Sequence, residues 1–345
     1  MSNEFLSPEG DLENHFVTDY WLIDQYVGDQ LWVWGSGTSG RLGNEVTAGA
    51  ISTPVTTSAG GTDWKQVECG SSHTAAIKTD GTLWTWGLGS YGALGNAQTT
   101  TRSTPVTTFA GGNDWKQVSG GGSHTAAIKT DGTLWTWGLG SYGKLGNAQT
   151  INSSTPVTTF AGGNDWKQVS AGSFGTAAIK TDGTLWTWGS GGYGALGNEQ
   201  TTDRSTPVTT FAGGTNWKQV GCGYYNTAAI KTDGTLWTWG RGGYGALGNE
   251  QTTDRSTPVT TFAGGNDWKQ ASAGFTHMVA IKTDGTLWTW GIAFSGRLGN
   301  AVTSATGVST PVTTFAGGTN WKQVSGGGSH TAAVQSGINA EYPLS

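Results

Sequence analysis

The chain has 345 residues and a formal net charge of −5, with 59 glycines and 19 tryptophans. Disordered glycine-rich chains are poor in aromatic residues, so this composition indicates a packed protein whose glycines form turns. The small acidic excess argues against a nucleic-acid-binding surface, which needs surplus lysine and arginine. No stretch is apolar enough to span a membrane, so we expect neither a nucleic-acid partner nor membrane insertion.

Residues 1–30 form an acidic leader, with seven acidic residues and no lysine or arginine. A segment without a basic start and a long apolar run is not a secretory signal. Its apolar residues follow helical spacing and predict a short helix with an apolar face. We expect this helix either to plug the rest of the chain or to dock into a larger assembly. The expected anchors are Phe16, Tyr20, Trp21 and Ile23.

A repeat begins at Leu31 and runs through most of the chain. The element LWxWG recurs at spacings of 52 residues and then 51 residues four times. A period near 50 residues is typical of a propeller or a solenoid. The copies start at Leu31, Leu83, Leu134, Leu185, Leu236 and Leu287.

Each copy divides into four short strand-like runs, here called A, B, C and D. In one copy these runs are residues 115–118, 125–129, 134–137 and 155–159. Runs B and C are joined by TDGT, and an Asp-Gly pair between alternating apolar residues is a strong hairpin signal. None of the runs has helical periodicity. Four antiparallel strands per repeat describe a propeller blade, with the tryptophans packing blade against blade.

The repeat also resembles a known family. The pattern G-x-x-H-T-x-A-(I/L)-x-x-x-G-x-L-W-x-W-G, followed by G-x-L-G-N, is similar to the regulator of chromosome condensation repeat. Clear instances are residues 70–87 with 92–96, and residues 121–138 with 143–147. The resemblance implies a closed β-propeller with run A innermost.

The phase of the repeat predicts how the ring closes. The first copy begins at run C, at Leu31, and the last ends at run B, at residues 331–334. We therefore expect an all-β, six-bladed propeller over residues 31–335, followed by a tail at 336–345. One composite blade would combine both ends of the chain and remove the open strand edges.

The loops between runs A and B, and between C and D, vary among copies and share one face of the propeller. Loops on a rigid scaffold commonly carry recognition, although drift in unconstrained loops is the competing interpretation. Large residues replace serine or glycine in three consecutive A–B loops. These are Phe174, Tyr224, Tyr225 and Phe275. From the C–D loops we add Tyr91, Tyr142, Tyr193, Tyr244, Arg241 and Phe294 as candidates for binding a protein or a glycan.

The remaining chemistry-bearing residues follow the repeat and favour structural roles. Four histidines share one A–B loop position, and we expect hydrogen bonding rather than a metal there. Cys69 and Cys222 occupy one repeat position three copies apart, so we expect small buried fillers near the axis and no disulfide. No nucleophile–base pair or phosphate loop stands out, so we expect no cofactor and no enzyme activity. The histidines are His73, His124, His277 and His330.

Three classes of function remain. The first is a non-catalytic binding or structural propeller of a virion or appendage, since near-verbatim repeats resemble phage-encoded propellers. It would attach to a protein partner through the leader and present its variable face, because both chain ends should emerge on the opposite face. The second is an intracellular regulator of the nucleotide-exchange type, which the resemblance implies. The third is a propeller lyase. We favour the first, with a virion location, or otherwise a cytoplasmic one.

Overall fold

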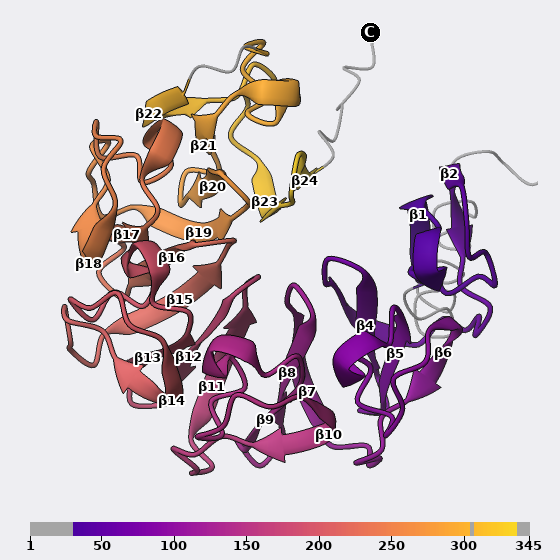
Figure 1. The fold of residues 1–345 in the computed structure, drawn as a ribbon. Coiled ribbons are helices and arrows are strands. Elements are labelled where there is room, and N and C mark those ends of the chain that lie inside the picture. The colour runs from indigo at the N-terminus through magenta and orange to yellow at the C-terminus, as the bar shows by residue number, and fades with distance from the viewer. Residues whose placement is uncertain (1–29, 304–306, 337–345) are drawn as a thin grey trace, which may run out of the picture.

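The computed structural model describes residues 30–303 and 307–336. This part of the chain holds 24 strands and six short 3₁₀ turns. Five antiparallel sheets have four strands each, and they are arranged radially about an axis (Figure 1). The predicted all-β propeller of four-stranded repeats is confirmed.

In each complete blade the predicted runs A to D appear in order, with run A nearest the axis. The strands of the first two complete blades are β3 (Trp64–Cys69), β4 (His73–Lys78), β5 (Leu83–Gly87), β6 (Arg102–Thr107), β7 (Trp115–Gly120), β8 (His124–Lys129), β9 (Leu134–Gly138) and β10 (Ser153–Thr158). The next two are β11 (Trp166–Ala171), β12 (Gly175–Lys180), β13 (Leu185–Gly189), β14 (Arg204–Thr209), β15 (Trp217–Cys222), β16 (Asn226–Lys231), β17 (Leu236–Gly240) and β18 (Arg255–Thr260). The fifth is β19 (Trp268–Ala273), β20 (His277–Lys282), β21 (Leu287–Ile292) and β22 (Gly307–Thr313).

The C–D loop of every copy contains a 3₁₀ turn. The turns are η1 (Thr38–Gly40), η2 (Ser90–Gly92), η3 (Ser141–Gly143), η4 (Gly192–Gly194), η5 (Gly243–Gly245) and η6 (Phe294–Gly296). The middle residue of each turn has positive φ, for example +63° at Tyr91. Four of these middle residues are tyrosines, and a large residue with positive φ is uncommon. The repeated backbone conformation gives the four tyrosines the same orientation relative to their blades.

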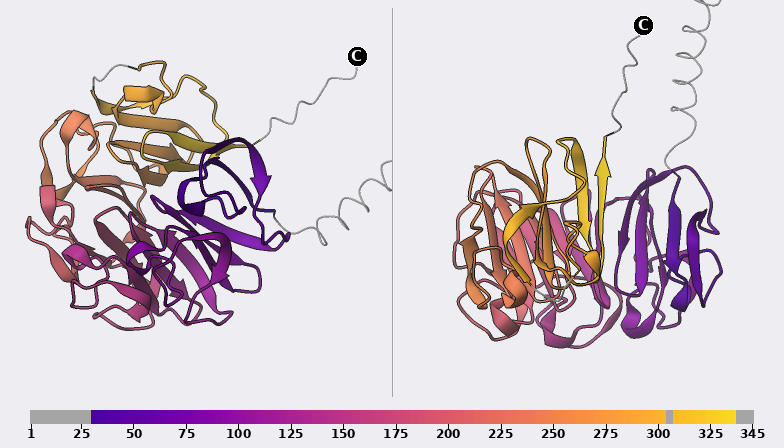
Figure 2. Two further views of the ribbon diagram at one scale, coloured as in Figure 1. Left: turned by 45° about the vertical axis from the view of Figure 1, so that its right-hand side comes forward. Right: turned by 90° about the horizontal axis from the view of Figure 1, so that it is seen from above.

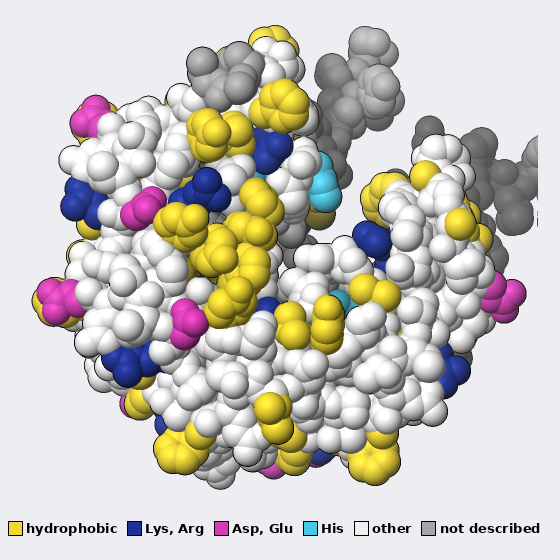
Figure 3. All heavy atoms as spheres, viewed as in Figure 1, with side chains coloured by type: hydrophobic (Ala, Val, Ile, Leu, Met, Phe, Trp, Pro, Cys, Tyr) yellow, Lys and Arg dark blue, Asp and Glu magenta, His cyan; other side chains and the backbone are white. Residues whose placement is uncertain are grey.

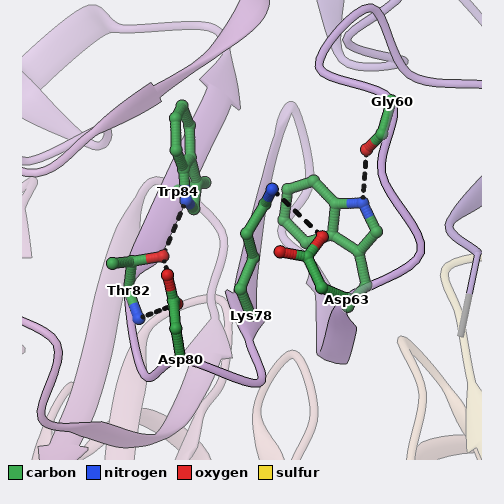
Figure 4. A network of polar contacts seen from close by, with 7 residues as sticks. Gly60, Asp63, Lys78, Asp80, Thr82 and Trp84 are labelled. Carbon is green, nitrogen blue, oxygen red and sulfur yellow. Dashed lines mark hydrogen bonds and ion pairs between the residues drawn. The ribbon is translucent and has the colours of Figure 1, made fainter. Parts of the chain in front are cut away.

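The TDGT turn closes each B–C hairpin through a side-chain network (Figure 4). Asp80 Oδ1 accepts hydrogen bonds from the backbone nitrogen and Oγ1 of Thr82, at 2.8 and 2.7 Å. Thr82 Oγ1 in turn accepts one from Trp84 Nε1 at 3.0 Å. Lys78 Nζ lies 3.1 Å from Asp63 Oδ1. The hydrogen bonds from Thr82 lower the pKa of Asp80, which confirms these aspartates as turn residues.

The second tryptophan of each LWxWG element except the first joins its blade to the preceding one. Trp137 is fully buried, and its Nε1 donates to the carbonyl of Ala93 at 2.9 Å. Its ring packs on Gly95, where a Cβ would lie 2.6 Å from Nε1. The same indole bond joins Trp86 to Arg41, Trp188 to Lys144, Trp239 to Ala195 and Trp290 to Ala246. The predicted blade-to-blade packing of the tryptophans is therefore confirmed.

A glutamine clamp joins the innermost strands of neighbouring blades. Gln168 Nε2 donates to the carbonyl of Val220 at 3.1 Å, and its Oε1 accepts from the nitrogen of the same valine at 3.1 Å. One side-chain amide thus satisfies both backbone groups of a residue in the next blade. The other clamps are Gln66–Val118, Gln117–Val169, Gln219–Ala271 and Gln270–Val324.

The predicted composite blade is absent from the described structure, and this expectation was wrong. β1 (Trp32–Ser36) and β2 (Ala50–Thr56) form one two-stranded sheet, and β23 (Trp321–Gly326) and β24 (Thr331–Gln335) form another. The two half-blades stand on either side of an opening in the ring (Figure 1). The physical reason is the angle between successive blades: five complete blades and two half-blades follow one another around the axis and bring the two chain ends near each other without pairing β1 with β24 (Figure 1).

The described chain ends lie on the face opposite the 3₁₀ turns. β24 follows the A–B loop and ends at the other rim, from which β1 starts (Figure 2). This placement agrees with the expectation that both ends emerge away from the variable loops. The proposed anchors of the leader, namely Phe16, Tyr20, Trp21 and Ile23, lie outside the described residues.

Replacing Gln168 by leucine should lower the free energy of unfolding by about 2 kcal/mol, because two backbone groups of Val220 lose their partners. Gln323 holds the equivalent position at the ring opening and is exposed. Gln323→Leu is therefore the matched control, and in dilute protein it should change stability little. Urea unfolding of both variants tests the clamp, and equal losses would contradict it.

Candidate functional site

The variable face carries a packed cluster of six rings, which we call the aromatic surface. Phe174 stacks on Tyr225 with centroids 4.5 Å apart and planes 11° apart. Tyr224 lies 3.8 Å from Phe275, measured between centroids. Hydrophobic side chains gather on this face in Figure 3. Its members are Phe174, Tyr224, Tyr225, Phe275, Tyr142 and Tyr193.

The rings of the aromatic surface are held by one another and remain open to solvent at their outer edges. Phe275, Tyr142 and Tyr193 are 41–44% exposed, whereas Phe174 and Tyr225 are half-buried. Burial raises the pKa of the Tyr225 hydroxyl, so this ring is neutral at physiological pH. Pre-packed aromatic rings lose little entropy on binding and commonly dominate interface energy.

The A–B loops beneath the rings are tied from blade to blade by backbone hydrogen bonds. The nitrogen of Ser173 donates to the carbonyl of Gly223 at 3.0 Å. The nitrogen of Phe275 donates to the carbonyl of Gly327 at 3.2 Å. Because these bonds use only the main chain, the loop side chains are free to differ among blades without weakening the ring.

Lys144 supports the aromatic surface from below, and the sequence reasoning missed it. Its side chain is buried, with Nζ 3.1 Å from the Ser173 carbonyl and 5.5 Å from the ring centroid of Phe174. Burial lowers the Lys144 pKa to about 8. Arg41 and Arg297 occupy the same repeat position and reach the carbonyls of Ser71 and Gly328. The sequence did carry a signal for this role, namely a basic residue at a repeat position where the other three copies have alanine.

The structure separates the predicted binding residues into two groups. Arg241 joins the aromatic surface, since its guanidinium carbon lies 5.3 Å from the centroid of Tyr193. Tyr91, Tyr244 and Phe294 are 49%, 47% and 54% exposed. Within residues 30–303 and 307–336, no ring contact joins these three to the aromatic surface.

Three of the repeat histidines have the structural role that we expected. His73 Nε2 is hydrogen-bonded to Thr125 Oγ1 at 2.9 Å. His124 and His277 make the same contact with Thr176 and Thr331, at 2.8 and 3.0 Å. Burial lowers the pKa of His73 and of His277 to about 4. In the described part of the chain, no three His, Cys, Asp or Glu side chains are grouped so as to hold a metal ion.

Both cysteines line the mouth of the axial hollow, which measures about 560 Å³. Each is a free thiol. Cys222 is half-buried, and burial raises the pKa of its thiol to about 12. Cys69 is exposed, so its prediction as a buried filler was wrong. It stands beside the ring opening, where no neighbouring blade covers it.

Glu68 is a charged residue near the axis that the sequence reasoning also missed. Burial raises its pKa to about 7, against a hydrogen bond from Gln66. Other copies have serine or glycine here, and Ser119 Oγ accepts a hydrogen bond from the nitrogen of Ala171 at 3.0 Å. A lone carboxyl with no nucleophile or second acid in a defined role does not make a catalytic site.

No helix among the described residues is long and apolar enough to cross a membrane.

Radial four-stranded blades with a variable loop face define a β-propeller scaffold that presents loops for binding. The chain belongs to the RCC1-like domain family, since the model of that family matches residues 27–338. It is 34% identical over 278 residues to the ultraviolet-B receptor UVR8 of Arabidopsis thaliana, covering 79% of this chain and 63% of that protein. It is 29% identical over 287 residues to the human E3 ubiquitin-protein ligase HERC2, covering 81% and 6%. The chain thus spans less than two thirds of these relatives.

Solved structures show the same fold at low sequence identity. Human WBSCR16 superposes with a TM-score of 0.75 at 21% identity, covering 89% of this chain and 82% of that one. Yeast RCC1 (Prp20), solved bound to Kap60, gives a TM-score of 0.74 at 19% identity, covering 97% and 82%. These likenesses establish the architecture, and the function rests on the surface of this chain.

The buried histidines should make the fold sensitive to acid between pH 6.5 and about 4. In that window the unfolded chain binds protons that the folded imidazoles exclude, so stability falls as the pH falls. A pKa lowered from 6.5 to about 4 corresponds to about 3 kcal/mol per histidine. Glu68 acts oppositely, since its raised pKa adds stability as the pH falls from about 7 to 4.5.

His73→Asn should flatten this dependence, because the asparagine side chain does not titrate. The repeat tolerates asparagine at this position, since Asn226 occupies it in another copy. Unfolding free energies measured from pH 7 to 4 for wild type, His73→Asn and Glu68→Ser separate the two effects. Equal slopes for wild type and His73→Asn would contradict the assignment.

Proposed function

We propose that this chain is a non-catalytic binding propeller that holds a protein partner on the aromatic surface. The observation that carries the proposal is the packed ring cluster, whose four A–B loop rings lie on three adjacent blades where the other three A–B loops have serine or glycine. Propellers of this fold are known to engage proteins, since yeast RCC1 was solved bound to Kap60. A rigid scaffold with a one-sided aromatic surface suits such a partner.

The arrangement of the rings favours a protein over a glycan. Sugar rings stack on free aromatic faces, but a face of Phe174 is covered by Tyr225, and Lys144 Nζ approaches its ring as well. Tyr224 is similarly tilted against Phe275, with centroids 3.8 Å apart. What remains open is a set of ring edges and hydroxyl groups. Such a surface suits apolar side chains and backbone carbonyls better than a sugar face.

The setting that we propose is a virion or an appendage. The leader would attach the propeller through Phe16, Tyr20, Trp21 and Ile23, and the aromatic surface would face outward. Two observations support this setting: the near-identical repeats and the position of the described chain ends opposite the 3₁₀ turns. A nucleotide-exchange role would instead require the aromatic surface to hold a GTPase.

Replacing Phe174, Tyr224, Tyr225 and Phe275 by serine should abolish partner binding while the propeller stays folded, with a lower melting temperature because rings packed across adjacent blades are lost. The loop backbone bonds do not depend on these side chains. The matched control replaces Phe109, Phe160, Phe211 and Phe262, which are 60–71% exposed on the D–A links, by serine. Affinity capture followed by titration with the purified partner measures the effect. Equal binding by both quadruple variants would reject the aromatic surface, and capture of an oligosaccharide alone would replace the protein by a glycan.

Crosslinking tests the proposed setting separately. A photo-crosslinker placed at residue 20 should join the chain to another component of a purified particle. Crosslinks confined to the chain's own aromatic surface, or absence of the chain from purified particles, would overturn the virion proposal. Neither result would bear on binding by the aromatic surface, which the serine variants test.

A further inference from the structure

The loops around the aromatic surface carry four exposed acidic residues. They lie on the C–D loops of two adjacent blades, the blade of β11–β14 and the blade of β15–β18. These two blades also provide three of the four A–B loop rings, namely Phe174, Tyr224 and Tyr225. In the other complete blades, the A–B and C–D loops contain no acidic residue. The four acidic residues are Glu199, Asp203, Glu250 and Asp254.

The fold does not require the negative charge of the two aspartates. Oδ1 of Asp203 accepts a hydrogen bond from the Gly191 nitrogen at 3.0 Å, and Asp254 makes the equivalent contact at 2.9 Å. In the blade of β7–β10, Oδ1 of Asn152 accepts the same bond from the Gly140 nitrogen at 3.0 Å. A neutral amide therefore caps this loop as well as a carboxylate does.

The backbone does not require the two glutamates either. Glu199 and Glu250 have φ of +67° and +65°, and Ala148 has +66° at the same repeat position. Within residues 30–303 and 307–336, none of the four acidic residues forms an ion pair. Their charge is therefore available to a partner.

The basic residues of the same loops are engaged within the chain. Arg204 and Arg255 are half-buried, and each donates a hydrogen bond to a glutamine of its own loop. Arg241 is half-buried over Tyr193, and Lys144 is buried beneath the aromatic surface. The fully exposed charge on these loops is therefore acidic.

The aromatic surface itself accepts positive charge. Two of its rings already hold a cation of this chain, at 5.3 and 5.5 Å from the ring centroid. The face of an aromatic ring attracts a cation through its quadrupole. Burial chiefly raises the pKa of Tyr225, and the negative charge of Asp203 adds to that rise. Figure 3 shows acidic side chains beside the hydrophobic cluster, so rings and carboxylates form one continuous surface.

We propose that the partner segment that lies on the aromatic surface is basic. Its lysine or arginine side chains reach Asp203 and Asp254, while its apolar side chains pack on the rings. Arginine suits both contacts, because a planar guanidinium stacks on a ring and binds a carboxylate. Glu199 and Glu250 add to the negative potential that steers such a segment to the rings. This inference rests on the proposed function and names the chemistry of the protein that binds.

Peptide selection tests this chemistry directly. A phage-displayed library of random peptides is selected on the immobilised full chain and counter-selected on the variant with serine at the four A–B loop rings. The recovered peptides should carry an excess of lysine and arginine among apolar residues. Recovered peptides that are neutral or acidic would overturn this inference and leave the proposed function standing. Recovery only of peptides that bind the wild type and the serine variant equally would overturn both.

Charge neutralisation measures what the two aspartates contribute. The double variant Asp203→Asn, Asp254→Asn keeps the loop caps, since Asn152 makes the same bond. It should lower the association rate of a recovered peptide about fivefold at about 0.1 M salt, which is the scale of two exposed ion pairs. At about 1 M salt the Debye length falls to about 3 Å, so the variant and the wild type should associate at the same rate.

The matched control is the double variant Asp131→Asn, Asp182→Asn. Both residues are exposed at B–C turns, at the opposite end of the blades, and an amide oxygen can accept the hydrogen bonds that each carboxylate accepts from threonine. The control removes the same charge and should leave the association rate unchanged. Surface plasmon resonance gives the rates, and circular dichroism checks that each variant is folded. An unchanged rate for the Asp203 and Asp254 variant, or an equal loss in the control, would overturn the proposal.

Discussion

One hydrogen bond, from an indole N–H to the carbonyl of the preceding blade, governs this fold. It recurs at the five closed junctions with a length of 2.9–3.0 Å. Each bond lies beneath a fully buried ring that fits only because a glycine faces it, as Gly95 faces Trp137. A buried ring removes about 150–250 Å² from water, so packing and the hydrogen bond act at the same point. This contact fixes how closely each blade approaches the preceding one.

The same constraint decides where the chain can vary. Residues that hold the junctions, such as Trp137 and Gln168, have their side chains in contact with a neighbouring blade. The A–B loops are joined by backbone bonds that do not depend on the identity of the loop side chains, as between Ser173 and Gly223. Their side chains are thus available for change, and the aromatic surface occupies this permitted region. Lys144 shows how one substitution at a junction position can also stabilise the loop above it.

Local structure could be predicted from the sequence because each repeat carries the same turn residues and the same strand periodicity. The run expected at residues 134–137 is the strand Leu134–Gly138, and the turn after Lys129 lies where the Asp-Gly pair placed it. Ring closure was not readable, because it depends on the angle between blades, which no spacing along the chain encodes. The exposure of Cys69 follows from that same angle. Lys144 and Glu68 required the three-dimensional neighbours that bury them.

Near-identical repeats have a consequence for the two edges of the opening. Because each junction surface is a copy of the others, an unmatched pair of surfaces retains the complementarity of a closed junction. Natural sheet edges are usually blunted by charged residues or proline. β1 reads WVWGS and β24 reads TAAVQ, so neither strand carries a charge. In the complete blades the strand equivalent to β24 ends in lysine, as at Lys129, whereas β24 ends in Gln335. Lys129 Nζ lies 3.1 Å from Asp114 Oδ1 of its own blade, and in the last copy Gln335 Nε2 donates instead to Asn320 Oδ1 at 2.6 Å. An uncharged amide pair thus replaces the ion pair at the strand that lacks its neighbour.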